Sequence, residues 1–259
     1  MKLFNPEVIL RTAENRADAY QKGSPVPHAV IDNILNPLLL KGIADRFPAA
    51  GNPVWYRYDN PLEKKLATNR LADLPEIFTE VFAQLNSSVF LRYLEQLTGI
   101  QNLIPDPHLN GGGLHMIEAD GMLSIHADYN YHPQTRLDRR LNVLIYLNED
   151  WKDEYQGHFE LWNKEMTGAV ARYAPLFNRM VVFTVSDTAY HGHPDPLQCP
   201  GNLSRKSLAV YYYTNGRPAE EISPPHSTLY QARPGDPMTP EIVELRRKRA
   251  LGRLTNSLK

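Results

Sequence analysis

The sequence lacks several features that would indicate particular classes of protein. It has one cysteine, Cys199, in 259 residues, so no disulfide can form within the chain and a reducing compartment is expected. Its 28 Lys and Arg residues nearly balance its 29 Asp and Glu residues, and the net charge of −1 favours neither nucleic acid nor an anionic membrane as a partner. No apolar run reaches about 18 residues, the length that indicates a transmembrane helix.

The N-terminus also lacks the apolar core of a secretory signal, because charges appear early in MKLFNPEVILRTAENRAD. There is no internal repeat and no low-complexity tract. A composition of 42% hydrophobic and 22% charged residues is ordinary for a globular protein, and the length allows one large domain with a sizeable core. We predict a cytoplasmic protein that acts on a small molecule, with no nucleic-acid or membrane partner. The oligomeric state is not indicated.

The first hundred residues are predicted to be mainly helical. A strand is expected at 28–35, and 51–61 reads as a loop or an edge strand. Apolar residues at helical spacing, with capping signals such as Asn36 at a helix start and Gly99 at a helix end, predict three helices, at 36–47, 73–85 and 90–97.

The pattern changes after IPDPHLNGGG. Short β-rich runs follow in quick succession, separated mostly by Asn, Asp, Gly and Pro clusters: GMLSIHADY, LNVLIYLN, HFELW, RMVVFTV and SLAVYYYT. This spacing predicts an antiparallel sandwich or barrel. A last helix is expected at about 239–254, with the basic run Arg246–Arg249 on its solvated face.

The stretch MLSIHADYNYHP, residues 122–133, places a histidine, a spacer and an aspartate in one predicted strand. Side chains alternate along a strand, so residues two apart project from the same face. His126 and Asp128 are therefore expected to share a face, together with Ser124, while the other face carries only apolar residues, Leu123, Ile125 and Ala127. A His-x-Asp triplet alone is weak evidence of a metal site, because it occurs by chance in many chains.

Residues further along the chain strengthen this interpretation. An apolar strand, RMVVFTV, leads to His191 in YHGHP. Arg205 starts the next strand, and Ser207, two residues later, is expected to share a face with it. Two histidines and one carboxylate on one side of a metal leave open positions, as in non-haem Fe(II) oxygenases. A guanidinium beside a hydroxyl is suited to bind a carboxylate in a bidentate manner.

In this order, the residues make the chain resemble the iron- and 2-oxoglutarate-dependent dioxygenases, specifically their prolyl-4-hydroxylase-like branch. The resemblance covers about residues 27–214 and is densest over 111–214. It is carried by HAD, RRLNVLIYLNEDW, FELW, YHGHP and RKSLAVYYYT. One departure is Gln156 in YQGHFELW, where relatives usually carry the first of two glycines.

The resemblance implies a mainly β fold with flanking helices and a double-stranded β-helix core, that is, a jelly-roll or cupin-like core. We expect a single oxygenase domain over 1–259. It would consist of a mainly helical part at 1–105, the catalytic core at 106–216, and a C-terminal extension at 217–259 that includes the last helix.

The resemblance also implies roles for individual residues. Three of them fall on the iron ligands: His126, Asp128 and His191. Four are expected to bind the co-substrate, with Arg205 on its distal carboxylate: Arg205, Ser207, Tyr146 and Asn142. The implied cofactors are Fe(II), 2-oxoglutarate and O₂, and ascorbate could serve as a reductant. The presence of Asp128 also favours hydroxylation over halogenation, because related halogenases replace this carboxylate with a small residue.

Several residues keep more than one interpretation. His193 competes with His191 as the third ligand, and His115 is either a co-substrate contact or a loop histidine. Gly111–Gly113 are expected to form only a turn. Cys199 is expected to have a structural role. The others could contact a substrate or serve packing and strand ends: Tyr129, Tyr131, Trp162, Arg139 and Arg140.

The function expected from this resemblance is hydroxylation of an unactivated C–H bond in a small molecule, with release of succinate and CO₂; desaturation or ring closure would need the same site. Two alternatives remain. One is a prolyl-type hydroxylase that acts on a peptide or protein. The other is a non-catalytic, cupin-like metal-binding or sensor protein, which would leave Arg205 and Ser207 without a purpose.

Overall fold

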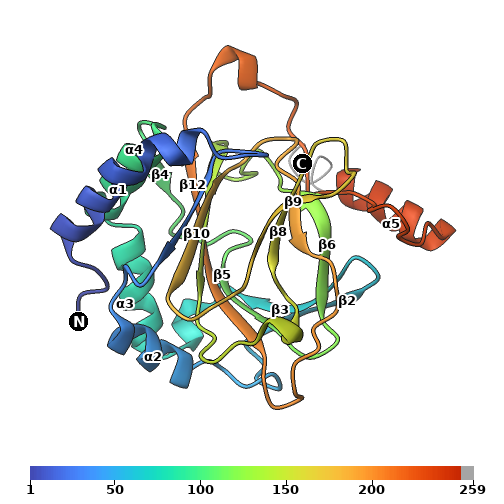
Figure 1. Cartoon of the computed structure of the whole chain (residues 1–259), viewed down its shortest axis with the longest axis horizontal. Helices are drawn as coiled ribbons and strands as arrows, with labels where there is room; N and C mark the ends of the chain where they lie inside the picture. The colour runs from blue at the N-terminus through green and yellow to red at the C-terminus, as the bar shows by residue number, and fades with distance from the viewer. Residues whose placement is uncertain (252–259) are drawn as a thin grey trace.

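A computed structural model describes residues 1–251 of the chain, and a curled antiparallel sheet forms its centre (Figure 1). The helices are α1 (Pro6–Gln21), α2 (Pro37–Asp45), α3 (Glu76–Leu85), α4 (Ser88–Thr98) and α5 (Pro240–Leu251). The first strands are β1 (His28–Asp32), β2 (Tyr56–Asn60), β3 (Glu63–Thr68), β4 (Ile104–Pro105), β5 (Gly113–Ile117), β6 (Met122–Ala127) and β7 (Asp138–Tyr146). They are followed by β8 (Phe159–Trp162), β9 (Ala169–Tyr173), β10 (Arg179–Thr184), β11 (His191–His193), β12 (Arg205–Thr214) and β13 (Leu229–Tyr230).

The main path through the sheet runs β1-β10-β7-β12-β5-β3-β6-β11-β8-β9. β3 is the strand that joins the two walls, because it pairs with β5 on one side and with β6 on the other. The sheet curls around an interior in which the two walls face each other. This is the jelly-roll core expected from the sequence, and the mainly β fold with flanking helices is confirmed.

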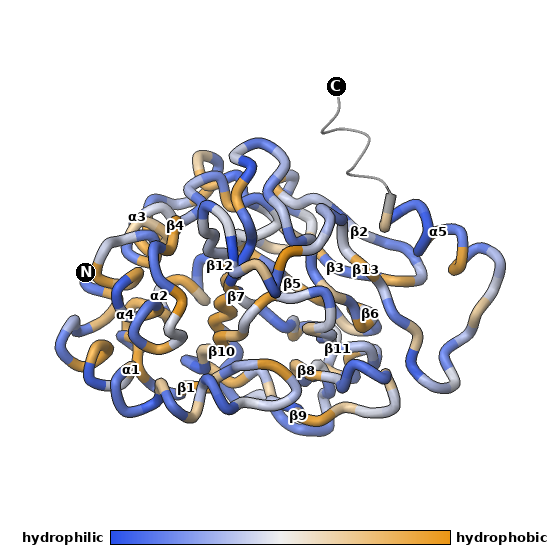
Figure 2. Tube along the Cα trace, turned by 90° about the horizontal axis from the view of Figure 1, so that it is seen from above, coloured by the Kyte–Doolittle hydropathy of each residue, from blue (hydrophilic) through white to orange (hydrophobic). Residues whose placement is uncertain are grey.

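Alternation in β7, β10 and β12 divides their side chains between two environments. On the outer face, a continuous apolar cluster packs against α1–α4: Leu141, Val143, Ile145, Met180, Val182, Leu208, Val210 and Tyr212. The apolar centre of these strands is visible in Figure 2. The inner face carries Asn142, Leu144 and Tyr146 of β7, as the alternation predicted, together with the apolar inner cluster around Val181 and Phe183.

The helices α2, α3 and α4 lie where the sequence predicted them. Asn36 caps α2 by accepting hydrogen bonds from the backbone N–H groups of Leu38 and Leu39, and Gly99 ends α4 in the left-handed conformation with φ 78°. Helix α1 was not predicted, because its buried apolar residues are few and widely spaced. Its Asn5 cap and the Pro6 that follows it were the signals that could have revealed it.

Several strands also escaped prediction, and most of them carry polar or small residues. β3 reads EKKLAT, and the β2–β3 hairpin covers much of the region expected to be a loop or an edge strand. β5 begins at Gly113, so this glycine belongs to a strand and does not only form a turn. A Cβ at Gly113 would come within 2.1 Å of the Thr68 carbonyl oxygen, so the β3–β5 pairing requires glycine here.

The strict alternation expected along β6 breaks in its middle. Between the pairs His191–His126 and His193–Leu123, β11 advances by two residues and β6 by three. The extra residue in β6 has the effect of a β-bulge, which changes the side that following residues face. As a result Leu123 lines the same cavity as His126, whereas the sequence placed it on the opposite face.

The segment after β12 returns along the sheet and ends in α5, on the side of the barrel opposite α1–α4 (Figure 1). It adds β13, which pairs with β6 next to His126. The helix predicted for 239–254 is confirmed as far as Leu251, and residues 252–254 lie outside the described part of the chain. Over residues 1–251, no helix combines the length and the apolar character needed to cross a membrane.

The interface between the sheet and the helices should dominate the stability of the fold. Leu208 is fully buried in this interface, so Leu208→Ala is expected to lower the free energy of unfolding by about 2–5 kcal/mol, through lost burial and a residual cavity. Leu38→Ala is the matched control, since Leu38 is 74% exposed and its loss should change little. Urea unfolding followed by circular dichroism measures both variants. Equal effects would show that this interface is not the main core.

Candidate active site

A cavity of about 380 Å³ lies inside the curled sheet. Six of the seven residues predicted for the iron and co-substrate sites line it: Asn142, His126, Asp128, His191, Arg205 and Ser207. The seventh, Tyr146, is fully buried and reaches the cavity indirectly, because its hydroxyl contacts Arg205. The fold therefore brings together residues that are up to 81 positions apart in the sequence.

Two histidines and one aspartate form a compact cluster in this cavity. His126 lies on β6, Asp128 directly follows β6, and His191 pairs with His126 across β6 and β11. One potential ligand atom from each of the three residues lies within 4.8 Å of the others. Asp128 Oδ1 is 3.6 Å from His126 Nε2, and Asp128 Oδ2 is 3.4 Å from His191 Nε2.

Backbone carbonyl groups orient both imidazoles. The Nδ1 of His126 lies 2.8 Å from the Ser124 carbonyl oxygen, and the Nδ1 of His191 lies 2.8 Å from the Ala189 carbonyl oxygen. A carbonyl oxygen only accepts, so Nδ1 carries the proton and Nε2 keeps its lone pair toward Asp128. Burial, followed by the proximity of His126, lowers the pKa of His191 to about 4, which keeps it neutral near pH 7. Both rings thus have the form that binds a metal.

Two further side chains hold the carboxylate of Asp128. Its Oδ2 accepts a hydrogen bond of 2.6 Å from Asn142 Nδ2 and one of 3.1 Å from Arg139 Nη2. Burial raises the pKa of Asp128, but the positive charge of Arg139 and the nearby His191 outweigh this effect and hold the pKa well below its usual range. The carboxylate is therefore ionised and fixed in position.

Arg139 is the centre of this support. It is 1% exposed, and its guanidinium lies between two rings, 4.4 Å from the Tyr129 centroid and 3.5 Å from the Tyr211 centroid. Its Nε and Nη2 also donate to Asn142 Oδ1 at 3.0 and 2.7 Å. Arg139 was open between a substrate contact and a strand end, and the structure gives it a different position, behind the carboxylate of the metal cluster.

Arg205 occupies another wall of the cavity. Its Nε donates to the Gly157 carbonyl oxygen at 2.7 Å, and its Nη2 donates to the Tyr146 hydroxyl at 3.2 Å. The side chain is 4% exposed, and burial lowers its pKa. Among residues 1–251, no carboxylate forms an ion pair with Arg205. A buried guanidinium without an anion is costly to maintain, so its partner is expected to be a ligand.

Ser207 shares the inner face of β12 with Arg205 and lies in a row of three neighbouring strands. It pairs with Tyr146 on β7 and with His115 on β5. His115 is therefore a strand residue that lines the cavity, and the loop interpretation is wrong. Desolvation, followed by the charge of Lys65, lowers the pKa of His115 to about 3.

His193 is separate from the metal cluster. It lines the cavity and is 4% exposed, and neither of its ring nitrogens has a hydrogen-bond partner. The cluster of possible ligand atoms contains His191 and not His193. The geometry therefore favours His191 as the third ligand and leaves His193 with two unsatisfied nitrogens facing the interior.

The remaining candidates fall into two groups. Tyr129 lines the cavity and supports Arg139, whereas Arg140 lies elsewhere and pairs with Glu221 at 2.9 Å. The other residues are not part of the cavity lining: Tyr131, Trp162 and Cys199. Trp162 is buried and donates to Glu160 at 2.8 Å, and Cys199 is buried in a small apolar cluster, as expected for a structural residue.

The departure at Gln156 has a conformational consequence. Gln156 has φ 59°, a backbone region that glycine adopts with little strain. Its carbonyl oxygen accepts a hydrogen bond of 3.0 Å from Trp151 Nε1, and Gly157, which follows, supplies the carbonyl oxygen that holds Arg205. The glycine-like conformation is thus retained at the position where relatives carry glycine.

Sequence analysis missed four residues at the edge of the cavity: Glu63, Lys65, Tyr230 and Arg249. Glu63 and Lys65 alternate along β3, in a segment too polar to be recognised as a strand. Tyr230 pairs with His126, with ring centroids 5.5 Å apart, and Arg249 reaches Glu63 from α5 at 2.7 Å. The spacing of Glu63 and Lys65, two residues apart and so on one face of a strand, was the one signal that could have revealed these two.

The donor set fits Fe(II). The Nε2 atoms of two imidazoles and one ionised carboxylate lie close together in the cavity lining, and this set of donors would suit Fe(II). The unpaired Arg205 provides a site for a carboxylate in the same cavity. The residues therefore fit both an iron ion and an acidic co-substrate.

Comparison with known proteins agrees with this chemistry. Residues 112–213 match the family model described as the 2OG-Fe(II) oxygenase superfamily. None of the curated proteins compared with the chain matches its sequence. Similar solved structures exist, all at low sequence identity, and such similarity concerns the fold.

Three of these structures illustrate the fold. A prolyl hydroxylase from Trichoplax adhaerens, in complex with a hypoxia inducible factor peptide fragment, has a TM-score of 0.58 and 15% identity, covering 80% of this chain and 91% of that one. A Pseudomonas putida prolyl-4-hydroxylase has a TM-score of 0.55 and 13% identity, covering 79% and 100%. HygX from Streptomyces hygroscopicus, with nickel, 2-oxoglutarate and hygromycin B bound, has a TM-score of 0.50 and 12% identity, covering 82% and 95%.

The matched segment contains every residue that the sequence assigned to the metal and the co-substrate. Residues 112–213 accordingly match the 2OG-Fe(II) oxygenase superfamily, and this match, together with the site they form, supports a 2-oxoglutarate-dependent dioxygenase.

Proposed function

We propose that this dioxygenase hydroxylates an unactivated C–H bond of a small molecule and releases succinate and CO₂. The observation that carries the proposal is one cavity in which a cluster of two histidines and a carboxylate lines the same space as a buried arginine that has no ion-pair partner within residues 1–251. The first group suits Fe(II) and the second suits the far carboxylate of 2-oxoglutarate. A binding or sensor protein would need the cluster but would have no use for Arg205.

In this proposal His126, Asp128 and His191 hold the iron, and their supporting contacts prepare them for it. The carbonyl oxygens of Ser124 and Ala189 place the Nδ1 proton and so direct both Nε2 atoms toward the cluster, and Arg139 helps to keep Asp128 ionised. Bound Fe(II), together with O₂ and 2-oxoglutarate, supplies the oxidation of the C–H bond. The protein supplies the position of each ligand atom.

Arg205 would bind the distal carboxylate of 2-oxoglutarate, with Tyr146 and Ser207 beside it. Gly157 holds Arg205 Nε from behind, which leaves part of the guanidinium for the co-substrate. Asn142 was expected to join this group. Since its amide oxygen accepts from Arg139 and its amide nitrogen donates to Asp128, we assign it instead to the positioning of the iron carboxylate.

The size and walls of the cavity favour a small substrate. Its volume of about 380 Å³ is in the range of small-molecule sites. The β2–β3 hairpin contributes Tyr56 and Tyr58 to its lining, and the C-terminal segment contributes Thr228 and Tyr230. The similar structures include one with a peptide and one with hygromycin B, so they favour neither kind of substrate. A prolyl-type peptide hydroxylase is the second candidate.

The reaction class predicts turnover without a substrate. Protein supplied with Fe(II), 2-oxoglutarate and O₂ should form succinate slowly, and chelation of the metal should stop this reaction. Asp128→Ala should abolish the iron-dependent part, because the carboxylate ligand is lost. Succinate is measured by mass spectrometry. Tight iron binding with no response to 2-oxoglutarate would instead favour the binding protein.

The ligand assignment is tested by two variants of neighbouring histidines. His191→Ala should weaken metal binding by at least tenfold, since one of three protein ligands is removed, whereas His193→Ala should retain the metal. Binding of Mn(II) by the apoprotein, followed by electron paramagnetic resonance, measures both without turnover. The reverse order of the two variants would identify His193 as the ligand.

Arg205 is tested against the residue that follows it. Arg205→Met should raise the Kd for 2-oxoglutarate by roughly 10- to 100-fold, the effect of losing a charge-assisted hydrogen bond of about 1.5–3 kcal/mol. Lys206→Met removes the same charge from a side chain that lies near Phe47, away from the cavity, and should leave the Kd unchanged. Calorimetric titration of the Mn(II)-loaded protein gives both values, and similar losses would argue against a specific anchor.

A further inference from the structure

The edge of the cavity carries more positive charge than the proposed iron and co-substrate sites require. We propose that Lys65 and Arg249, arranged around Glu63, form a second anion-binding subsite, and that the small-molecule substrate carries a carboxylate or phosphate that binds there. This inference rests on the proposed function and specifies its substrate class.

The charges that line the cavity do not balance. There are four cations, Lys65, Arg139, Arg205 and Arg249, and two anions, Glu63 and Asp128. Bound Fe(II) and the doubly negative 2-oxoglutarate would add charges that cancel each other, so the positive excess would remain. A cavity lined by an excess of one sign attracts ligands of the opposite sign.

One of the two excess charges is located beside Glu63, where two cations share one carboxylate; the other is that of Arg205. This carboxylate is 3% exposed and is shared by two cations, with Lys65 Nζ at 3.2 Å and Arg249 Nη2 at 2.7 Å. Within residues 1–251, Lys65 has no other ion-pair partner, and it lies 5.2 Å from the Tyr58 ring centroid. A lysine has three N–H donors and an arginine five, so both keep donors for a further oxyanion.

The subsite lies beside the metal cluster in the lining of the same cavity. Glu63 pairs with Leu123 on β6, and Leu123 pairs with His193 on β11, so the three form one row next to the row of His126 and His191. His193 is 4% exposed with both ring nitrogens unpartnered, and it lines the space between these groups. An unsatisfied buried imidazole there indicates that a polar ligand completes its hydrogen bonds.

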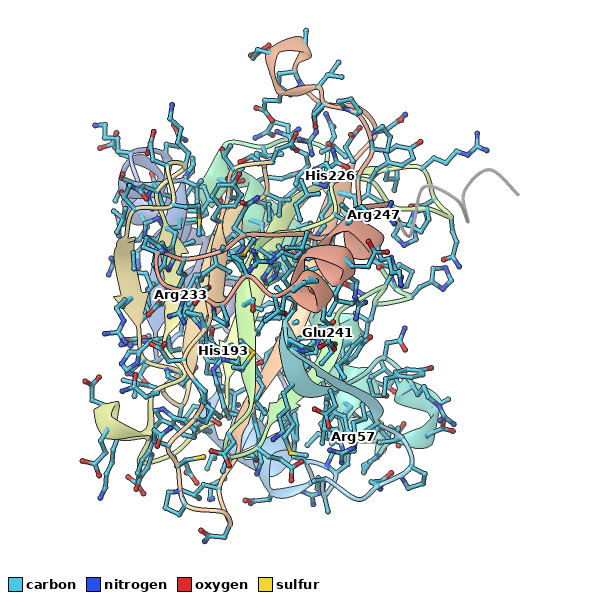
Figure 3. All side chains as sticks on the ribbon, turned by 90° about the vertical axis from the view of Figure 1, so that its right-hand side faces the viewer. Arg57, His193, His226, Arg233, Glu241 and Arg247 are labelled. Atoms are coloured by element: carbon cyan, nitrogen blue, oxygen red, sulfur yellow. The ribbon has the colours of Figure 1, made fainter. Side chains whose placement is uncertain are left out.

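The two cations come from outside the matched core. Lys65 lies on β3 and Arg249 on α5, whereas the family match spans residues 112–213. Figure 3 shows α5, with Glu241 and Arg247, on the side of the barrel where His193 is labelled. The subsite is therefore built from residues outside the segment that matches the family model, as expected for a feature that recognises a particular substrate.

The experiment uses the full chain loaded with Mn(II) and 2-oxoglutarate, which binds ligands without turnover. The probes are N-acetyl amino acids, 2-hydroxy acids and sugar phosphates, each compared with its neutral amide or unphosphorylated counterpart. Ligand-observed NMR and the shift in Tm measure binding. We expect anionic members to bind at least about tenfold more tightly than their neutral counterparts, and the preference to weaken at high salt. The comparison of carboxylates with phosphates identifies which oxyanion fits.

Variants of neighbouring residues separate the subsite from general charge effects. Lys65→Met should weaken the binding of the anionic probes about tenfold or more. Lys64→Met makes the same change in charge on an exposed residue that does not line the cavity, and it should have no effect. Arg249→Met should weaken binding, and Arg247→Met, on an exposed arginine paired with Glu244, is its control.

Glu63→Gln is expected to change the affinity for the anionic probes in the opposite direction to Lys65→Met. It removes the negative charge that neutralises Lys65 and Arg249, so the anionic probes should bind several-fold more tightly. A merely structural role for the cluster would weaken binding in both Lys65→Met and Glu63→Gln. If Glu63→Gln does not fold, the pair of arginine variants decides the question.

The outcomes also separate this inference from the proposed function. If the wild-type protein binds neither Mn(II) nor 2-oxoglutarate, the proposed function fails. If it binds both, but no anionic probe binds or the neutral counterparts bind equally well, the anion subsite is wrong and the oxygenase assignment stands. Equal losses in Lys65→Met and Lys64→Met would also overturn the subsite.

Discussion

The site depends on one buried carboxylate, that of Asp128. Four groups lie against it: the Nε2 atoms of His126 and His191, and the hydrogen-bond donors of Arg139 and Asn142. A buried carboxylate is costly unless its charge and its lone pairs are matched, and here Arg139 provides the charge and Asn142 a hydrogen bond. Arg139 is in turn stabilised by the rings of Tyr129 and Tyr211, because a buried guanidinium has the same problem. The rings of Tyr129, which follows Asp128 in the chain, and of Tyr211 on β12 therefore contribute, through Arg139, to the orientation of a metal ligand.

The sheet makes this arrangement possible by separating two environments with a single set of strands. The odd positions of β7 form the apolar contact with the helices, and the even positions supply Asn142 and Tyr146 to the interior. A shift of one residue in the pairing of β7 would exchange these faces, so the apolar helix contact also fixes the register of the polar site. In β6, the extra residue between Leu123 and His126 adjusts the direction of the metal ligands without changing the outer packing.

The strength of each sequence signal explains which parts of the fold and site could be predicted. The apolar strands and the His-x-Asp, His and Arg-x-Ser positions combine strong local patterns with the order of a known family, and the structure brings these residues into one cavity. Strand β3 could not be found in this way, because EKKLAT is a strand whose alternating residues face a polar cavity and not an apolar core. Arg139 was a candidate from the sequence, but its contact with Asp128 depends on how the fold brings β7 close to the end of β6. The bulge in β6 leaves no signal in the order of apolar residues.

The residues that the sequence did not reveal are also those proposed to recognise the substrate, and both facts follow from their polarity. Residues that bind a variable ligand are polar and lie on strand edges, loops and terminal helices, where patterns of burial are weakest. Arg249 comes from the terminal helix α5, and Glu63 and Lys65 come from β3, a strand too polar to show a pattern of burial; the three meet because α5 folds back to reach β3. The iron and co-substrate residues lie instead on the central strands. The division between a core that performs the oxidation and an added edge that selects the molecule to be oxidised thus follows from where polar residues can be placed in this fold.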